Sequence, residues 1–168
     1  MTYRKAAAVM LLNTDDKVFV AQRIDSSLDA WQMPQGGLDK GEDSRVGALR
    51  ELKEETGIGA HLVEIVACSS RELLYDVPSE LAGQLWGGKY RGQCQTWFLA
   101  RFNGTDADID LATEHPEFRA YQWIDPWRLP DLIVAFKKRL YEQVLEEFAA
   151  HLPPKRLGRV DKRDSQAG

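Results

Sequence analysis

Hydrophobic positions divide the chain into short apolar runs separated by polar and glycine-rich segments. Residues 6–12 and 18–22 are apolar runs typical of strands, and the polar residues 13–16 between them predict a hairpin turn. The same pattern predicts further strands at 62–66, 93–102 and 120–124, and a loop at 83–92. The pattern therefore predicts a sheet whose strands are well separated along the chain.

Two helices are expected between and after these strands. Asp43 or Ser44 can cap a helix that runs to Thr56, where Gly57 supplies a left-handed stop. A longer helix is expected from Pro130 to about Leu152. Its apolar face would consist of Leu132, Ile133, Phe136, Leu140, Val144 and Phe148. Mixed strands around one helix, followed by a closing helix, indicate an α+β or α/β sandwich.

Length and charge narrow the picture further. A chain of 168 residues suits one domain with a sizeable core, which we expect at 1–152. Residues 153–168 are rich in lysine and arginine and predict a flexible basic tail, with a nucleic-acid-binding arm as an alternative. The formal net charge is -4, so a polyanionic partner would have to bind a local basic cluster. The sequence leaves the oligomeric state open.

The cysteine content and the hydropathy of the chain indicate the cellular compartment in which we expect the protein. Cys68 and Cys94 are too few for a disulfide framework and lack metal-site spacing, so we expect reduced thiols. No run approaches the ~20 apolar residues of a membrane helix. The apolar run 6–12 is too short for a convincing signal peptide. We therefore expect a soluble cytoplasmic protein without a membrane partner.

The helix predicted at 43–56 carries three carboxylates within five residues: Glu51, Glu54 and Glu55. At ~100° per residue they share one arc of the helix, where like charges repel. A solvated acidic face is the ordinary interpretation, yet Arg50 cannot neutralise all three charges. Crowded carboxylates raise each other's pKa unless a cation holds them. Oxygen ligands suit Mg²⁺ or Mn²⁺ together with substrate phosphates, so the pattern predicts half of a metal–phosphate site.

The same helix carries a family resemblance. Gly36, five residues, Glu42, seven residues and the run RELKEETGI at 50–58 match the Nudix box at every fixed position. The chain thus resembles the Nudix hydrolases, which implies an α/β/α sandwich with a mixed sheet. It also implies hydrolysis of a nucleoside diphosphate linked to another group. By the same resemblance Glu51, Glu54 and Glu55 hold divalent ions, the Gly36 carbonyl adds a ligand, and Arg50 orients the box through ion pairs.

The resemblance extends from about Tyr3 to Phe148. Residues 31–37 (WQMPQGG) are similar to a lead-in shared by bacterial RNA 5′-pyrophosphohydrolases and asymmetric dinucleoside tetraphosphate hydrolases. Residues 75–78 (YDVP) and 91–98 (RGQCQTWF) resemble segments of the tetraphosphate hydrolases. This strand commonly has lysines where the chain has Cys94 and Thr96, and a tryptophan often found before Tyr75 is missing. These departures leave the details of substrate binding open.

Further site residues follow by position in the resembling segments. Glu117 resembles a carboxylate outside the box that joins the metal site, with surface solvation as the alternative. Arg4, Arg23 and Lys137 resemble basic residues near the phosphate chain, and each could equally be a surface charge. Tyr75 and Phe136 offer flat faces on which a base could stack for ~1–3 kcal/mol. Core packing is the alternative for both rings.

Two other metal or phosphate motifs are only superficially present. EF-hand ligand positions are occupied by Asp106, Asp108, Asp110 and Glu117. The sixth position of such a loop must be glycine and is Leu111 here, so we expect a polar connecting loop. The glycine-rich residues 87–92 lack the Gly-Lys-Ser/Thr ending of a phosphate-binding P-loop.

Together these features predict a metal-dependent pyrophosphohydrolase. Water attacks phosphorus while Glu54 or Glu117 accepts the proton. The YDVP and RGQ segments favour a dinucleoside polyphosphate, such as diadenosine tetraphosphate cut to ATP and AMP. The alternative substrate is the 5′ end of RNA, from which pyrophosphate is removed. Hydrolysis of oxidised nucleotides or nucleotide sugars fits the box but not its flanks. A non-catalytic nucleotide-binding domain is the alternative from another class, and the presence of every box carboxylate opposes it.

Overall fold

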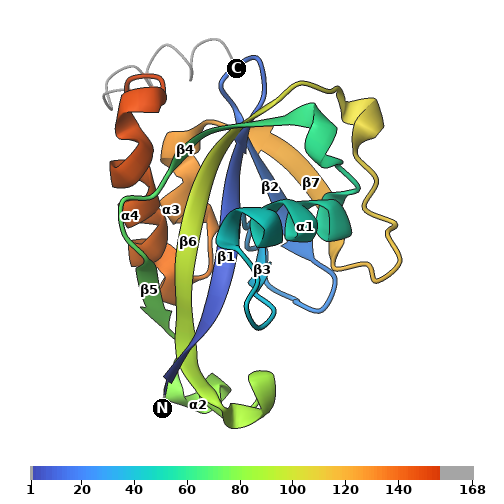
Figure 1. Ribbon diagram of the computed structural model, residues 1–168. Coiled ribbons are helices and arrows are strands. Elements are labelled where there is room, and N and C mark those ends of the chain that lie inside the picture. Colours follow the sequence, from blue (N-terminus) through green and yellow to red (C-terminus); the bar gives the residue numbers. More distant parts are fainter. Residues whose placement is uncertain (1, 156–168) are drawn as a thin grey trace.

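A seven-stranded mixed sheet forms the centre of the computed structural model, which describes residues 2–155. The strands are β1 (Thr2–Leu12), β2 (Val18–Arg23), β3 (Gln35–Gly37), β4 (Val63–Cys68), β5 (Leu73–Asp76), β6 (Tyr90–Phe102) and β7 (Phe118–Ile124). The α-helices are α1 (Ser44–Thr56), α2 (Ser79–Ala82), α3 (Leu129–Leu132) and α4 (Lys138–Phe148). Helix α1 crosses one face of the sheet, and α3 and α4 cover the other (Figure 1). The expected α/β/α sandwich with a mixed sheet is confirmed.

Strand β1 lies at the middle of the order β4-β6-β1-β2-β7. It runs parallel to β6 from the pair Thr2↔Tyr90 to the pair Leu12↔Arg101. It pairs with β2 only beside the hairpin, at Leu12↔Val18. Closer to the N-terminus of β1, its neighbour is β3 instead of β2. There β3 pairs antiparallel with β1 from Ala6↔Gly37 to Ala8↔Gln35. This exchange brings the two glycines of β3 into the sheet close to α1.

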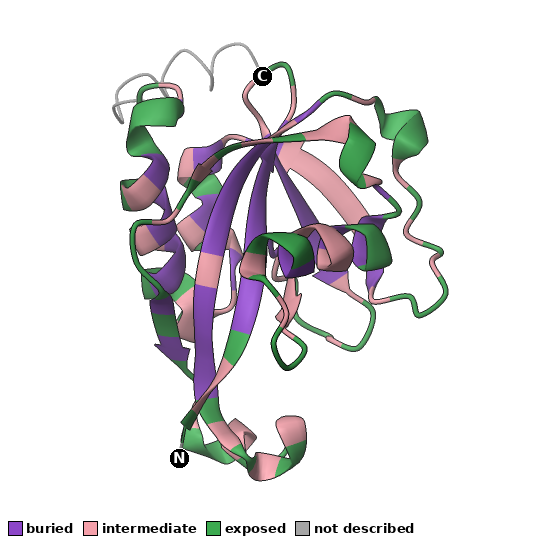
Figure 2. Ribbon diagram, in the orientation of Figure 1, coloured by how far each residue is buried: buried purple, intermediate pink, exposed green. Residues whose placement is uncertain are grey.

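Alternate side chains of β1 enter two separate cores, as expected for a strand covered on both faces. Figure 2 shows that β1 is buried over most of its length. Ala7, Val9 and Leu11 lie in the core beneath α1, which contributes Ala48 and Leu52. The opposite core, beneath α4, contains Ala8, Met10, Leu12, Trp97, Leu140, Val144 and Phe148. The central strand β1 is therefore packed on both faces, and this packing fixes the position of side chains attached to it.

Both predicted ends of α1 are confirmed. The Asp43 side chain accepts a hydrogen bond from the Val46 backbone N–H at 3.1 Å, so Asp43 is the N-cap. Gly57 has φ 76° and its N–H donates to the Lys53 carbonyl, which closes the helix. Local capping thus determines where the carboxylate helix begins and ends.

The prediction of a single helix from Pro130 to about Leu152 is wrong. Helix α3 ends at Leu132, and Ile133 and Val134 are extended, with ψ of 158° and 141°. Two β-branched residues in succession disfavour continued helix. The Leu132 carbonyl also accepts a hydrogen bond from the Trp31 N–H instead of an intrahelical one. A 3₁₀ turn at Ala135–Lys137 then leads into α4.

Smaller differences concern the sheet. Strands β3 and β5 were not expected, and β6 begins at Tyr90, inside the loop expected at 83–92. The tail expected at 153–168 lies outside the described residues except for its first three. Within the described part of the chain, no helix combines the length and apolar character needed to cross a bilayer.

Candidate active site

A cavity of about 530 Å³ opens at the end of the sheet where β3 lies beside β1. Its wall combines cations, carboxylates and aromatic rings. All five residues that the sequence nominated for substrate binding line it: Arg4, Arg23, Tyr75, Phe136 and Lys137. Gly36, Glu51 and Glu117 line the same cavity, so predicted phosphate-binding and metal-binding groups meet in one place.

Three carboxylates form a cluster beside the cavity, two of them at its wall and one buried behind it. Glu51, Glu55 and Glu117 each offer an oxygen, and these oxygens lie within 4.8 Å of one another. Glu55 is fully buried, and neither of its oxygens has a hydrogen-bond partner among the described residues. Burial raises the pKa of Glu55 well above its usual range, and the neighbouring Glu117 and Glu51 raise it further. The cluster therefore opposes negative charge unless a cation is present.

These residues fit a hard divalent cation. A buried carboxylate with two unpartnered oxygens is unfavourable by itself. Mg²⁺ or Mn²⁺ would supply the missing partner, and both prefer the oxygen-only donor set that the three glutamates offer. The orphaned oxygens of Glu55 are therefore the structural observation that points to a metal here.

Glu54 lies apart from this cluster. Its side chain is 56% exposed, and it accepts a hydrogen bond from Nη1 of Arg50 at 3.1 Å. The expectation that helical spacing brings all three box carboxylates to one point thus holds for Glu51 and Glu55 only. These two are one turn apart and face the sheet, whereas Glu54 is rotated by ~100° towards solvent. Glu117, from the loop before β7, completes the cluster in its place.

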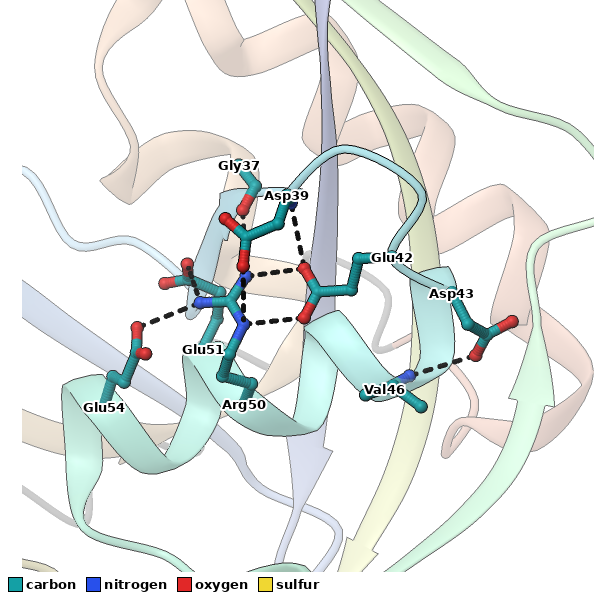
Figure 3. Close-up of polar contacts among 8 residues, drawn as sticks. All are labelled: Gly37, Asp39, Glu42, Asp43, Val46, Arg50, Glu51 and Glu54. Atoms are coloured by element: carbon teal, nitrogen blue, oxygen red, sulfur yellow. Dashed lines mark hydrogen bonds and ion pairs between the residues drawn. The ribbon is translucent and has the colours of Figure 1, made fainter.

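The Arg50 side chain, on α1, forms hydrogen bonds with the loop at residues 37–42 that precedes the helix (Figure 3). Its guanidinium donates to both oxygens of Glu42, at 2.7 and 2.8 Å, and to the Gly37 carbonyl at 3.1 Å. It also donates to Glu51 at 2.9 Å. The hydrogen bonds from Arg50 are the main reason that the pKa of Glu42 falls to about 2. This geometry agrees with the orienting role that the resemblance implied for Arg50.

Cations and aromatic rings are paired along the cavity wall. The Lys137 Nζ lies 5.0 Å from the centroid of the Tyr75 ring, and the ring of Phe136 lies 6.1 Å from that of Tyr75. The Arg4 guanidinium lies 5.7 Å from the Trp86 ring. Burial lowers the pKa of Lys137 to about 8, and nearby Arg23 lowers it too. The break between α3 and α4 is what brings Phe136 and Lys137 to this wall.

Arg23 lines the cavity beside the carboxylate cluster. It donates to both oxygens of Asp25, each at 2.8 Å, and lies 3.9 Å from a carboxylate oxygen of Glu117. A guanidinium in this position can contact an anion without leaving the carboxylate cluster.

Several cavity residues were not nominated from the sequence. The polar and aromatic ones among them include Trp86 and the glutamines Gln32, Gln35 and Gln93. The alternation Gln93-x-Gln95-x-Trp97 could have indicated polar groups on the same face as a buried tryptophan. The unusual Cys94 points away from the cavity, and its thiol donates to Glu72 at 2.6 Å. Neither Cys94 nor Thr96 lines the cavity, so the departures from the usual strand leave its wall unchanged.

Known proteins resemble this chain over nearly its whole length. The family model of the NUDIX domain matches residues 2–144. RNA pyrophosphohydrolase of Sphingopyxis alaskensis is 57% identical over 148 residues, which are 88% of this chain and 94% of that protein. RNA pyrophosphohydrolase of Roseobacter denitrificans is 53% identical and covers 90% of this chain and 95% of that protein.

Solved structures share the fold at lower identity. A C. elegans Ap4A hydrolase in a binary complex has a TM-score of 0.64 and 22% identity, covering 88% of this chain and 98% of that one. The E. coli dihydroneopterin triphosphate pyrophosphohydrolase has a TM-score of 0.64 and 24% identity, covering 85% and 97%. The chain therefore belongs to the NUDIX family and is a Nudix pyrophosphohydrolase, an enzyme that acts on phosphoric anhydrides.

Proposed function

We propose that this enzyme is an RNA pyrophosphohydrolase that removes pyrophosphate from 5′-triphosphorylated RNA. The observation that carries the proposal is the similarity to proteins of that name, at 49–57% identity over 88–90% of the chain. This revises the preference for a dinucleoside polyphosphate, which rested on the short YDVP and RGQ segments. The Ap4A hydrolase structure, at 22% identity, supports the fold alone.

The cavity suits a phosphate chain attached to a base. Arg4, Arg23 and Lys137 offer positive charge to the phosphates in a protein whose net charge is -4. Tyr75 and Phe136 offer aromatic faces on which a base could stack. These roles follow from position in the cavity and are part of the proposal.

Nudix hydrolases use divalent cations, and we assign the ion here to Glu51, Glu55 and Glu117. The Gly36 carbonyl and Glu54 are proposed as further ligands. When bound, Mg²⁺ or Mn²⁺ would neutralise phosphate charge and lower the pKa of water. The protein's part is to hold these carboxylates close together beside the cavity, with Arg50 fixing the direction of Glu51.

Proton acceptance from the attacking water is assigned to Glu117 or Glu54. Glu117 lines the cavity and is partly exposed, so it can meet a water next to the substrate. Glu54 would first have to leave Arg50. The geometry therefore favours Glu117 as the general base.

Asymmetric hydrolysis of diadenosine tetraphosphate remains a second candidate because of the YDVP and RGQ segments. A side-by-side assay with Mg²⁺ separates the two, using 5′-triphosphorylated RNA and diadenosine tetraphosphate at equal concentration. We expect a higher kcat/KM for RNA, with pyrophosphate released and a 5′-monophosphate left behind. A higher kcat/KM for the dinucleotide, with ATP and AMP as products, would overturn the proposal.

A further inference from the structure

Four side chains at and behind the cavity wall form one branched chain of hydrogen bonds. The indole N–H of Trp97 donates to Oε1 of Gln95 at 2.9 Å. Nε2 of Gln95 then donates to Oε1 of Gln93 at 2.7 Å and to Oε1 of Gln35 at 3.3 Å. Trp97, Gln95 and Gln93 are all at least 98% buried, so water cannot easily replace these bonds.

The direction of this chain follows from its first member. An indole N–H can only donate, so the group of Gln95 facing Trp97 must be its carbonyl oxygen. The NH₂ group of Gln95 is then turned towards Gln93 and Gln35, and each of these must present its oxygen to it. Consequently the NH₂ groups of Gln93 and Gln35 are the ends left for other partners. One tryptophan thus determines the orientation of three amides.

Both terminal amides belong to the cavity wall. Gln93 and Gln35 line the cavity together with Arg4 and Gly37, whereas Gln95 lies behind them. A third amide, Gln32, is 7% exposed and also lines the cavity, and its Nε2 has no hydrogen-bond partner among the described residues. The cavity therefore has several uncharged N–H donors in addition to its cations.

Neutral donors have a physical advantage in a cavity that Glu51 and Glu117 also line. A further lysine or arginine at this position would pair with the carboxylates and compete with a bound cation. An amide binds a phosphate oxygen without such competition, and hydrogen bonds to a charged acceptor are stronger than neutral ones. Because Trp97 fixes the orientation of the amides through Gln95, the NH₂ groups of Gln93 and Gln35 do not have to rotate when the substrate binds.

We propose that Gln93 and Gln35 bind phosphate oxygens of the substrate and that Gln95 is a positioning residue that turns their NH₂ groups towards the cavity. The inference rests on the proposed function only in requiring a phosphate chain in the cavity. It therefore applies equally to RNA and to a dinucleotide.

Three neutral substitutions test it in the full-length enzyme: Gln93→Met, Gln95→Met and, as control, Gln143→Met on α4 outside the cavity. The dissociation constant of inorganic pyrophosphate is measured by calorimetry at fixed Mg²⁺, and kcat and KM are measured on triphosphorylated RNA. Folding is checked by thermal unfolding, and the indole N–H signal of Trp97 by NMR. Should Gln95→Met fail to fold, Gln95→Asn keeps an amide that is one methylene too short.

We expect Gln93→Met to weaken pyrophosphate binding about tenfold, the effect of one lost hydrogen bond to a charged acceptor. Gln95→Met should weaken it by a smaller factor and shift the Trp97 signal, while Gln143→Met changes neither. A folded Gln93→Met that binds pyrophosphate within twofold of wild type would overturn the phosphate contact. A folded Gln95 variant that binds normally would overturn the positioning role. Failure of the proposed function is recognised separately, because RNA would then remain uncut while pyrophosphate binding still responds to Gln93.

Discussion

The carboxylate of Glu51 occupies the space that a side chain at residue 36 would need. A methyl group added to Gly36 would lie 2.0 Å from Cδ of Glu51, far inside van der Waals contact. The contact arises because β3 replaces β2 beside β1 and so brings Gly36 under α1. The obstructing atoms are the end of a flexible side chain, and hence a larger residue would displace Glu51 without preventing folding.

Gly36→Ala should therefore lower activity strongly while leaving the fold intact. Moving the Glu51 carboxylate by about 1 Å is expected to lower kcat/KM on triphosphorylated RNA by about 100-fold. The melting temperature of the metal-free protein should change little. Gly83→Ala is the matched control, because Gly83 has φ -72° and a methyl group there meets nothing within 4 Å. Full activity in Gly36→Ala would show that the position of Glu51 is not critical.

Glu55→Gln should stabilise the metal-free enzyme and greatly weaken metal binding. The pKa of Glu55 in the folded protein is raised, chiefly by burial, so the folded state binds its proton more tightly than the unfolded state does. The contribution of Glu55 to the free energy of unfolding is therefore fully present below its usual pKa near 4.5. This contribution is lost as the pH rises towards the raised pKa of the folded state. Over that window the loss is about 1.4 kcal/mol per pH unit for one proton.

Chemical unfolding in a chelator from pH 5 to 8 measures this dependence. Wild type should lose stability relative to Glu55→Gln as the pH rises, and Mn²⁺ should restore it in wild type only. The exposed Glu64→Gln is the control and should follow wild type. Parallel stability curves for wild type and Glu55→Gln would mean that burial does not disfavour the charge of Glu55.

Glu54→Gln should weaken Mn²⁺ binding less than Glu55→Gln does. Glu54 lies outside the cluster and is held by Arg50, whereas the oxygens of Glu55 have no hydrogen-bond partner among residues 2–155. We expect the loss for Glu55→Gln to reach about 100-fold, the upper range for disrupting the support of a metal site. Electron paramagnetic resonance of free Mn²⁺ gives both affinities. Equal losses would indicate that Glu54 leaves Arg50 to bind the ion as tightly as Glu55 does.

Sequence reasoning located the elements that are determined locally. The helix at 44–56 was predictable because Asp43 and Gly57 terminate it through their own side-chain and backbone chemistry. The break after Leu132 was not, because Leu140, Val144 and Phe148 continue the helical period. There the tertiary hydrogen bond from Trp31 and the extended Ile133 override the pattern. Strand β3 is likewise created by pairing with β1, since two of its three residues are glycine.

The candidate site was predictable in its residues but not in its arrangement. The family resemblance nominated Glu117 and the five cavity residues, and all of them line one cavity. A helical wheel treats Glu54 and Glu55 as neighbours, yet the sheet buries Glu55 while Arg50 draws Glu54 outwards. The amides of Gln35 and Gln93 come from different strands, and only the folded structure brings them to the same partner, Gln95.

Lys137 should make substrate binding sensitive to pH near 8. Burial, aided by nearby Arg23, lowers its pKa to about 8 from a usual value of 10.5, so the free enzyme loses this positive charge as the pH rises through 8. If the charge binds phosphate, kcat/KM on triphosphorylated RNA should fall by up to about tenfold per pH unit above 8, mainly through KM. Lys137→Arg tests the cause, because arginine stays protonated throughout this range. Its kcat/KM should be flatter between pH 8 and 9.5, whereas the exposed control Lys138→Arg should keep the wild-type decline. The same decline in Lys137→Arg would place the titrating group elsewhere, and phosphate binding would then depend on Arg4 and Arg23.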